Sequence, residues 1–301
     1  MQGLTIAITG ASGYVGWHLA VALKRDGHNV IAYARRRVPG CTVVSNYLTG
    51  TLYDNADVVI HCAGLAHQHA NPAKFYTANA ELPVALGRKL ADLPKPPRLI
   101  FFSSIAAREI ERRITSVHDE EIARRRNAYA LSKLMAERGL AKVSGVGVTC
   151  VRPPMVYGPH CPGNLPKLFR AIKRCVPLPL GFATAPRHYI YIENLVDAVR
   201  HMLAHPDNTF IHEIADEQPI STRDLCKRLA GEIGRTAILL PVPRFLAKFM
   251  LKLAGRRKVY SGLFKELIVR NTLQGWRPRY SVHEGIREFA ATTAENGRKA
   301  G

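Results

Sequence analysis

The chain has 301 residues, of which 47% are hydrophobic and 22% charged, and this is enough apolar side chain to bury a large core. Lysine and arginine (43) outnumber aspartate and glutamate (23), giving a formal net charge of +20. The basic residues are spread along the chain instead of forming one stripe interleaved with aromatic residues, and no nucleic-acid motif is present. The charge therefore does not indicate a nucleic-acid-binding protein. The sequence has no internal repeat and no low-complexity tract.

The chain begins with an apolar strand, predicted over residues 4–8, that leads into a glycine-rich turn and a helix predicted over residues 14–25. Gly10, Gly13 and Gly16 lie in the turn and in the first helical turn. Because they lack a Cβ atom, the backbone can approach a pyrophosphate, which then binds at the helix N-terminus. A purely structural tight turn is the alternative, and the position between a strand and a helix favours phosphate binding.

Apolar runs and helical patterns alternate over the first half of the chain. Strands are predicted at residues 29–34, 57–62, 98–103 and 147–152, and helices at 73–92 and 127–143. The Pro-rich residues 93–97 are interpreted as the turn before the third of these strands. This alternation predicts an α/β fold of the Rossmann type, a doubly wound parallel sheet with helices on both faces.

Three residues form the candidate catalytic group. Tyr129 and Lys133 are four residues apart on a predicted helix, so their side chains share a face. A nearby ammonium group favours the phenolate and lowers the pKa of a tyrosine, as a general acid/base at a hydroxyl or carbonyl requires. Ser104 follows the apolar strand 98–103, at the sheet edge where parallel sheets bind ligands. An exposed Tyr/Lys pair without function is the alternative.

Together these segments resemble the extended short-chain dehydrogenase/reductases, specifically the nucleotide-sugar epimerase/dehydratase branch, over almost the whole chain. The similar motifs are the glycine loop 9–16, the D-V-V-I-H-x-A segment 57–64, Asn79 after Phe75 and Tyr76, Ser103-Ser104, Tyr129 with Lys133, R-P-x-x-V-Y-G-P at 152–159, G-N-x-x-x-L at 163–168, the arginine segment 187–195, and L-Q-G-W-R-P at 273–278.

The resemblance implies roles for individual residues. Ser104, Tyr129 and Lys133 are implied to be catalytic, and Ser104, Asn164 and Arg187 to contact the substrate, with Arg187 at its diphosphate. Cofactor contacts are implied for Gly10, Ser12, Gly13, Tyr14, Val15, Gly16, Arg35, Arg36, Cys62, Ala63, Gly64, Asn79, Ser103, Tyr129, Lys133, Pro153 and Val156. We expect no bound metal. The family also implies two domains: residues 1–158 plus 188–215 bind NAD(P), and 159–187 plus 216–301 form a smaller C-terminal lobe that binds the nucleotide sugar.

The end of the second strand bears on cofactor choice. NAD-using members of the family carry a carboxylate there that binds the adenosine ribose, whereas this chain has Ala34 followed by Arg35, Arg36 and Arg37. An arginine offers a charge-assisted partner to a 2′-phosphate. We therefore favour NADP(H), with NAD(H) as the alternative if these arginines only lie on the surface.

These features predict an oxidoreductase acting at C4 of a UDP-hexose or UDP-N-acetylhexosamine, in the synthesis of surface polysaccharide such as O-antigen. A 4-ketoreductase is favoured, and a UDP-glucose or UDP-N-acetylglucosamine 4-epimerase is the alternative. Residues 105–109 match the segment after the serine in neither group, and the T-D-E triad of dehydratases is absent. A non-catalytic NADP-sensing protein is a third hypothesis, against which the intact Ser104, Tyr129 and Lys133 argue.

Two basic segments have open interpretations. Residues 108–113 and 124–126 are expected in a loop between Ser104 and Tyr129, either framing the substrate entrance or simply solvated. Residues 245–258 combine helical apolar spacing with basic residues. We favour a lobe helix packed on the core, and a helix lying on an anionic membrane surface is the alternative.

The remaining expectations concern the cell and the assembly. No secretory signal is apparent, and the six cysteines (Cys41, Cys62, Cys150, Cys161, Cys175 and Cys226) lack C-x-x-C pairing, so we expect reduced thiols in a cytoplasmic protein without a transmembrane segment. The resemblance implies a homodimer that pairs through the helix bearing Tyr129 and the helix after Asn79. The latter helix carries Leu82, Val84, Ala85, Leu86 and Leu90.

Overall fold

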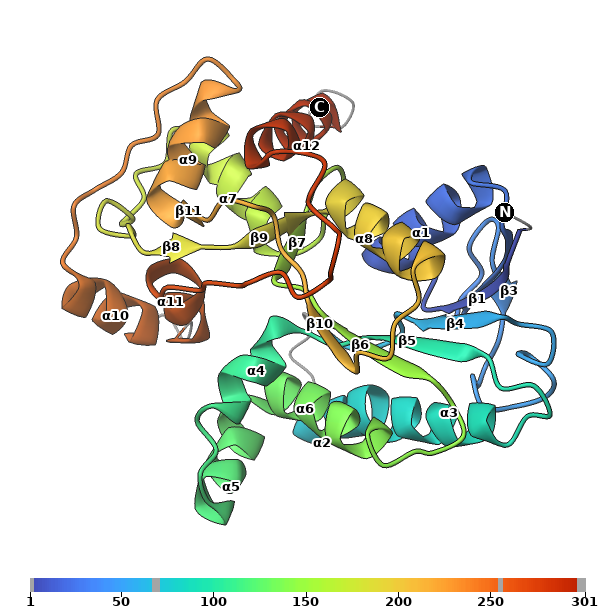
Figure 1. The fold of residues 1–301 in the computed structure, drawn as a ribbon. Coiled ribbons are helices and arrows are strands. Elements are labelled where there is room, and N and C mark those ends of the chain that lie inside the picture. Colours follow the sequence, from blue (N-terminus) through green and yellow to red (C-terminus); the bar gives the residue numbers. More distant parts are fainter. Residues whose placement is uncertain (1–2, 67–70, 254–256, 297–301) are drawn as a thin grey trace. The chain divides into compact units, whose positions relative to one another are not determined.

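The computed structural model describes residues 3–66, 71–253 and 257–296 (Figure 1). The chain divides into two compact units. The first unit comprises Met1–Pro154, Ala198–Ile214 and Asn271–Trp276, and the second comprises Met155–Asp197, Ala215–Arg270 and Arg277–Gly301.

The bounds of these units differ from those of the expected domains at residues 155–158, 188–197, 215 and 271–276. Residues 155–158 and 188–197 belong to the second unit, because strand β7 (Met155–Tyr157) pairs in parallel with β9 (Tyr189–Tyr191) and not with the large sheet. Residues 271–276 belong to the first unit, where the Glu213 N–H donates to the Thr272 hydroxyl.

The first unit is built on a seven-stranded parallel sheet. Its order is β10–β6–β5–β4–β1–β2–β3, with bounds β1 Thr5–Thr9, β2 Asn29–Ala34, β3 Thr42–Val43, β4 Val58–His61, β5 Arg98–Phe102, β6 Val148–Arg152 and β10 Ile211–Glu213. The central strands are buried almost throughout, as their continuous apolar runs require in a sheet covered on both faces. The predicted doubly wound fold is confirmed. Its strand order reverses between β1 and β4, where such sheets bind ligands.

Helices cover both faces of this sheet. In Figure 1, α1 lies on one face and α3 and α6 lie on the other. The helices are α1 (Tyr14–Arg25), α2 (Pro72–Tyr76), η1 (Thr77–Glu81, a π-helical turn), α3 (Leu82–Ala91), α4 (Ile105–Glu111), α5 (Val117–Arg126), α6 (Ala128–Leu140) and α8 (Ile192–Ala204), of which α8 starts in the second unit. On α3, Leu86 and Leu90 are fully buried within the core of this unit, so they cannot contribute to the predicted dimer face.

The segment between Ser104 and Tyr129 was expected to be a loop, and this expectation is wrong. It forms α4 and α5, because two serines act as N-caps: Ser104 Oγ accepts from Ala106 N (3.2 Å) and Ser116 Oγ from Asp119 N (3.1 Å). Arg108, on α4, neither frames an entrance nor lies in solvent. It is 9% exposed and donates to Glu213 at 2.7 Å.

The second unit contains two short sheets and several helices. β7 pairs with β9, and β8 (Pro186–Arg187) pairs antiparallel with β11 (Ile220–Ser221). Its helices are α7 (Asn164–Lys173), α9 (Thr222–Gly231), α10 (Arg244–Leu253), α11 (Arg257–Phe264) and α12 (Val282–Asn296). Phe169 of α7 and Phe289 of α12 pack edge to face in its core, with ring centroids 5.6 Å apart.

A buried carboxylate organises part of this unit. Asp216 accepts hydrogen bonds from Asn194 Nδ2 (2.8 Å), the Tyr191 N–H (2.9 Å) and the Tyr157 hydroxyl (2.9 Å). Burial raises the pKa of Asp216 to about 6, and these hydrogen bonds act in the opposite direction. In the described part of the chain we find no helix with the length and apolar character needed to cross a bilayer.

Candidate active site

The β1–α1 turn has the geometry of a diphosphate-binding loop. Gly10 has φ +71°, and a Cβ on it would lie 2.5 Å from the Ala63 backbone nitrogen, so only glycine fits there. A Cβ on Gly16 would lie 2.5 Å from the Gly10 carbonyl oxygen, so the close contact between the turn and the first turn of α1 also requires glycine. Ser12 lies in this turn, and Tyr14 and Val15 are the first two residues of α1.

The N-terminus of α1 is suited to an anion. Gly13 is the N-cap residue and supplies no side-chain cap, and the first turn contains no acidic residue. The N–H groups of that turn are therefore directed to the outside of the helix end, where a phosphate group binds favourably. These residues fit the diphosphate of a dinucleotide.

The loop after β4 lies beside this turn. The Cys62 N–H donates to the Thr9 carbonyl at 3.1 Å, and this contact brings the carboxyl ends of β1 and β4 together. Burial raises the pKa of the Cys62 thiol to about 12, so this residue lines the site without acting as a nucleophile. A Cβ on Gly64 would lie 3.5 Å from Lys133 Nζ, which places the loop against the candidate catalytic lysine.

Asn79 holds that loop in place. Its amide oxygen accepts from the Leu65 N–H (2.8 Å), and its amide nitrogen donates to the Leu65 carbonyl (2.9 Å) and to Ser132 Oγ (3.2 Å). The side chain is fully buried, and these bonds occupy both ends of the amide. Asn79 thereby shapes the cofactor region through Leu65 and α6.

Ser104, Tyr129 and Lys133 lie at the carboxyl end of β5. The Ser104 side chain lies close enough to the Tyr129 hydroxyl to act on its pKa, in the direction that favours the phenolate. Lys133 Nζ donates to the Phe102 carbonyl at 2.7 Å and lies 4.6 Å from the centre of the Phe101 ring. The three residues therefore form one group of two hydroxyl side chains and a buried lysine.

The protonation of this group differs from the expectation. Burial raises the pKa of Tyr129, whereas the sequence predicted that Lys133 would lower it. The reason is that Lys133 is directed at the Phe102 carbonyl. Burial also lowers the pKa of Lys133 itself to about 8. Ser104 is therefore the side chain that favours the phenolate of Tyr129 in this structure.

Ser103 has a structural role that the sequence did not indicate. Its hydroxyl donates to Glu137 at 2.5 Å, and Glu137 also accepts from Arg152 Nε (2.9 Å) and Nη2 (2.5 Å). Arg152 further contacts Glu111 at 3.2 Å. Glu137 was not predicted, although it lies four residues after Lys133 and so continues the face of Tyr129 and Lys133 along α6.

Arg35 and Arg36 are exposed directly after β2. The charge of Arg35 acts to lower the pKa of Tyr47, and so does a hydrogen bond from the Gly10 backbone, although burial raises this pKa overall. Arg35, Tyr47 and Gly10 therefore lie close together at the carboxyl ends of β1 and β2. This is where the resemblance places the adenosine ribose.

The predicted substrate residues are found in the second unit, apart from Ser104. Asn164 is exposed as the first residue of α7. Val156, which was expected to contact the cofactor, also lies in this unit, in β7. Arg187, in β8, donates to the Lys265 carbonyl and to the Tyr189 hydroxyl. Pro153 lies in the first unit, where its carbonyl accepts from the Ile105 N–H (3.0 Å).

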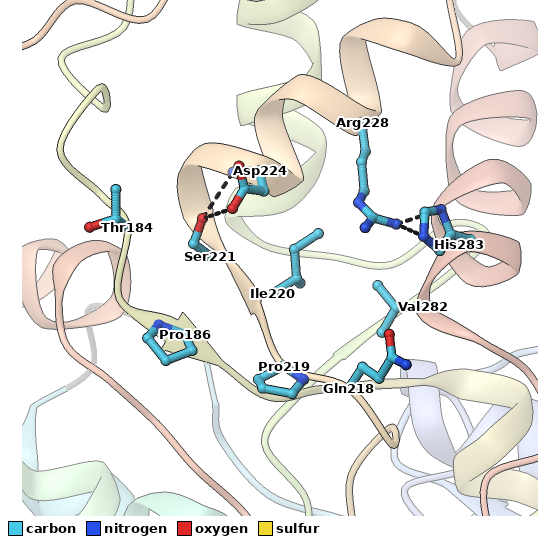
Figure 2. Close-up of a pocket in the computed structure, with 10 residues that line it drawn as sticks. All are labelled: Thr184, Pro186, Gln218, Pro219, Ile220, Ser221, Asp224, Arg228, Val282 and His283. Carbon is cyan, nitrogen blue, oxygen red and sulfur yellow. Dashed lines mark hydrogen bonds between the residues drawn. The ribbon is translucent and has the colours of Figure 1, made fainter.

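A small pocket in the second unit has a cavity volume of about 250 Å³ (Figure 2). At its rim Ser221 donates to Asp224 at 2.6 Å, and Arg228 contacts His283. The pocket includes Pro186 but neither Asn164 nor Arg187, and it is smaller than sites that enclose a drug-sized ligand.

Among the described residues, no cluster of three or more histidine, cysteine or acidic side chains could hold a metal ion.

A model of the NAD dependent epimerase/dehydratase family matches residues 6–215, and this stretch contains both the glycine turn and the Ser104, Tyr129, Lys133 group. The chain belongs to this family. It is an enzyme of the NAD(P)-dependent epimerase or reductase type within the extended short-chain dehydrogenase/reductases, as the sequence predicted.

Individual known proteins resemble this chain over different lengths. A UDP-glucose 4-epimerase from Vibrio cholerae is 30% identical, with 95% of this chain and 94% of that protein covered. A ceramide reductase from Caulobacter vibrioides is 31% identical, with 63% and 57% covered. The structure of a UDP-glucuronic acid 4-epimerase from Bacillus cereus with UDP-glucuronic acid and NAD has a TM-score of 0.73 at 18% identity, with 97% and 100% covered, and this likeness shows the shared fold.

His61, the buried histidine of the D-V-V-I-H-x-A segment, should make the stability of the protein depend on pH. Burial and the nearby charge of Lys133 lower the pKa of His61 to about 3, so the folded protein keeps it neutral while the unfolded chain binds a proton below about pH 6.5. The free energy of unfolding should therefore fall as the pH drops from 6.5 toward 3. Its slope from this residue approaches about 1.4 kcal/mol per pH unit.

Urea unfolding of wild type and His61→Asn at several pH values isolates this effect. Asp216 acts in the opposite direction, because the stability from its raised pKa is present below about pH 4 and is lost as the pH rises through 6. The difference between wild type and variant removes that contribution. The exposed His118 is the control, since His118→Asn should keep the wild-type slope. An unchanged slope in His61→Asn would contradict the assignment.

Proposed function

We propose that this chain is a UDP-sugar 4-epimerase that binds a nicotinamide dinucleotide at the β1–α1 turn. The observation that carries the proposal is the grouping of Ser104 and Tyr129 with the buried Lys133 at the carboxyl end of β5. The Vibrio cholerae UDP-glucose 4-epimerase supports the substrate class, because its likeness extends over nearly the full length of both chains. We place the enzyme in the synthesis of surface polysaccharide.

In this proposal the residues of the chain transfer the proton of the sugar 4-hydroxyl and bind its oxygen. Tyr129 takes the proton of the sugar 4-hydroxyl and later returns it, and Ser104 hydrogen-bonds the same oxygen. Lys133 holds positive charge beneath the site at Phe102. The bound dinucleotide supplies a hydride acceptor and donor. The first-turn N–H groups of α1 and the loop of Cys62 and Gly64 would hold it.

The proposal is tested by incubating the purified enzyme with UDP-glucose and following UDP-galactose by NMR, without added cofactor and then with NAD. Formation of UDP-galactose supports the epimerase, and UDP-N-acetylglucosamine and UDP-glucuronic acid are tested in parallel. The epimerase assignment fails if no UDP-sugar is interconverted, although NADPH is consumed when a UDP-4-keto sugar is supplied.

A 4-ketoreductase is the second candidate, and Ala34 is the observation that favours it. Ala34 is buried at the end of β2 with the exposed Arg35 after it, so no carboxylate is available there for the ribose. A net reductase exchanges its cofactor in every turnover, and cells keep the NADP(H) pool reduced for such reactions. The likeness to a ceramide reductase, over about two thirds of the chain, supports this class.

Cofactor preference follows from the same residues. We expect NADPH to bind at least about tenfold tighter than NADH, a difference of about 1.4 kcal/mol that one charge-assisted contact to a 2′-phosphate can supply. Arg35→Ala should abolish the preference, and Ala34→Asp should reverse it. Titration of each cofactor against protein fluorescence measures the ratio. Arg37→Ala removes a neighbouring exposed arginine and should leave the ratio intact; equal affinities in the wild type would refute the NADP assignment.

The substrate diphosphate gives a separate prediction. Arg187→Ala should raise the KM for the UDP-sugar by about tenfold or more, because a charge-assisted contact to phosphate is lost, while cofactor affinity stays the same. Steady-state kinetics with cofactor titration separates the two. Arg170→Ala, an exposed arginine on α7 of the same unit, is the matched control. A wild-type KM in Arg187→Ala would contradict the prediction and would show that Arg187 has only a structural role, through its contacts to Lys265 and Tyr189.

A further inference from the structure

Helix α10 exposes a continuous apolar face. Phe245 is 77% exposed, Phe249 55% and Leu246 41%, whereas Ala247 is only 2% exposed. At 100° per residue the three exposed side chains fall within an arc of about 100°, and Ala247 lies outside that arc. The favoured expectation of a helix packed on the core therefore accounts for Ala247 but not for the two phenylalanines.

This apolar face lies in a stretch of chain that has only positive charge. Residues 233–265 contain eight lysine and arginine residues and no aspartate or glutamate. Lys248, beside Phe245 and Phe249 on the helix, is exposed. Figure 1 shows α11, whose sequence begins Arg257-Lys258, next to α10. Residues 254–256, which complete the basic cluster noted in the sequence, lie outside the described residues.

Only one kind of partner fits both properties. A groove in another protein would cover the phenylalanines but has no general reason to match a stretch of sequence that contains eight basic residues and no acidic one. A nucleic acid would match the charge but not the exposed apolar arc. An anionic lipid surface matches both, because acyl chains accept the aromatic rings and acidic headgroups attract the basic residues around them.

We propose that α10 is a peripheral membrane-docking helix that lies in the headgroup region of an anionic bilayer. Phe245, Leu246 and Phe249 enter the boundary between headgroups and acyl chains. Lys248 pairs with the acidic headgroups, and the excess of basic residues in this stretch of the sequence adds to the attraction. α10 belongs to the second unit, whereas Ser104, Tyr129 and Lys133 belong to the first, so we expect docking and turnover to be independent properties of the protein.

Vesicle co-sedimentation tests the proposal with the full-length protein. We expect binding to vesicles of phosphatidylcholine mixed with phosphatidylglycerol and little binding to phosphatidylcholine alone. The double variant Phe245→Ser/Phe249→Ser and the single variant Lys248→Glu should each lower the partition coefficient by at least about tenfold, with the same thermal melting temperature as the wild type. Turnover of a dissolved UDP-sugar should be unchanged in both.

Two control variants separate docking from general attraction between a basic protein and an acidic surface. Val117→Ser removes an 81% exposed apolar side chain on α5, and Lys142→Glu reverses an exposed charge at the end of α6. Both should bind vesicles like the wild type. A second measurement uses Phe245→Trp, a variant that should still bind vesicles. When anionic vesicles are added, its tryptophan emission should shift to shorter wavelength by more than the emission of the wild type does.

Four results would overturn the proposal. These are absence of binding to anionic vesicles, equal binding to neutral ones, equal weakening by the control variants, or no shift in the Phe245→Trp emission. A change from dimer to monomer in Phe245→Ser/Phe249→Ser, seen by light scattering, would instead identify a second copy of the chain as the occupant of this face and would also overturn it.

Discussion

Replacing Tyr129 by phenylalanine is expected to lower kcat by about 10³-fold while the fold and the cofactor affinity are retained. The variant removes the hydroxyl that exchanges a proton with the substrate oxygen and leaves the ring in place. The phenyl ring of the variant has no group that can take up or release this proton. Stopped-flow or steady-state turnover measures kcat, and fluorescence titration measures cofactor binding.

Two comparisons make this experiment decisive. Tyr76→Phe removes another largely buried tyrosine hydroxyl of the same unit, one that donates to the Arg124 carbonyl, and should leave kcat nearly unchanged. Ser104→Ala should lower kcat less than Tyr129→Phe, because it removes a hydrogen bond and leaves the proton path. Turnover of Tyr129→Phe within a few-fold of wild type would exclude Tyr129 as the acid/base.

Breaking the buried ion pair beneath the active site should have the largest effect on stability. We expect Glu137→Leu to lower the free energy of unfolding by about 3 kcal/mol or more, because it leaves Arg152 buried without its closest carboxylate and Ser103 without its acceptor. Both side chains of the pair are at most 6% exposed, so solvent screens the lost interaction little. Urea unfolding followed by circular dichroism measures the change.

The surface pair Glu120 and Arg124 on α5 provides the matched control. Its atoms are 3.4 Å apart and its side chains are about a third to a half exposed, so Glu120→Leu should cost no more than about 1 kcal/mol. The double variant Glu137→Leu/Arg152→Met should recover much of the loss, since it removes both buried charges. Equal losses for Glu137→Leu and Glu120→Leu would show that the buried network adds no stability of its own.

The sequence predicted the parts of the fold that depend on local pattern. Apolar runs interrupted by glycine and helical spacing located the main strands and helices of the first unit, because in a parallel sheet covered on both faces a strand must be apolar throughout. The same reasoning missed α4 and α5. Their positions depend on the N-caps Ser104 and Ser116, and a single hydroxyl oxygen at a cap is a weaker signal than a run of apolar residues.

The candidate site was predicted as a set of residues, but not as a set of contacts. The grouping of Ser104 with Tyr129 follows from β5 and the helix, and in the structure Ser104 lies close enough to Tyr129 to act on its pKa. Partners far apart in sequence could not be predicted from spacing. Lys133 donates to the Phe102 carbonyl and Ser103 to Glu137, and both bonds require the packing of α6 against β5.

The π-helical turn η1 makes the active-site region sensitive to the number of residues as well as to their identity. Asn79, in this turn, hydrogen-bonds the backbone of Leu65. The wider winding of the turn accommodates one more residue than an α-helical turn would. Deleting one residue from Thr77–Glu81 would restore regular winding while α2 and α3 keep their helical register, because the wide turn itself takes up the additional residue, so the change of direction would fall on the residues within the turn. A shortened chain would then present a different side chain to Leu65, although every residue implied in catalysis would still be present.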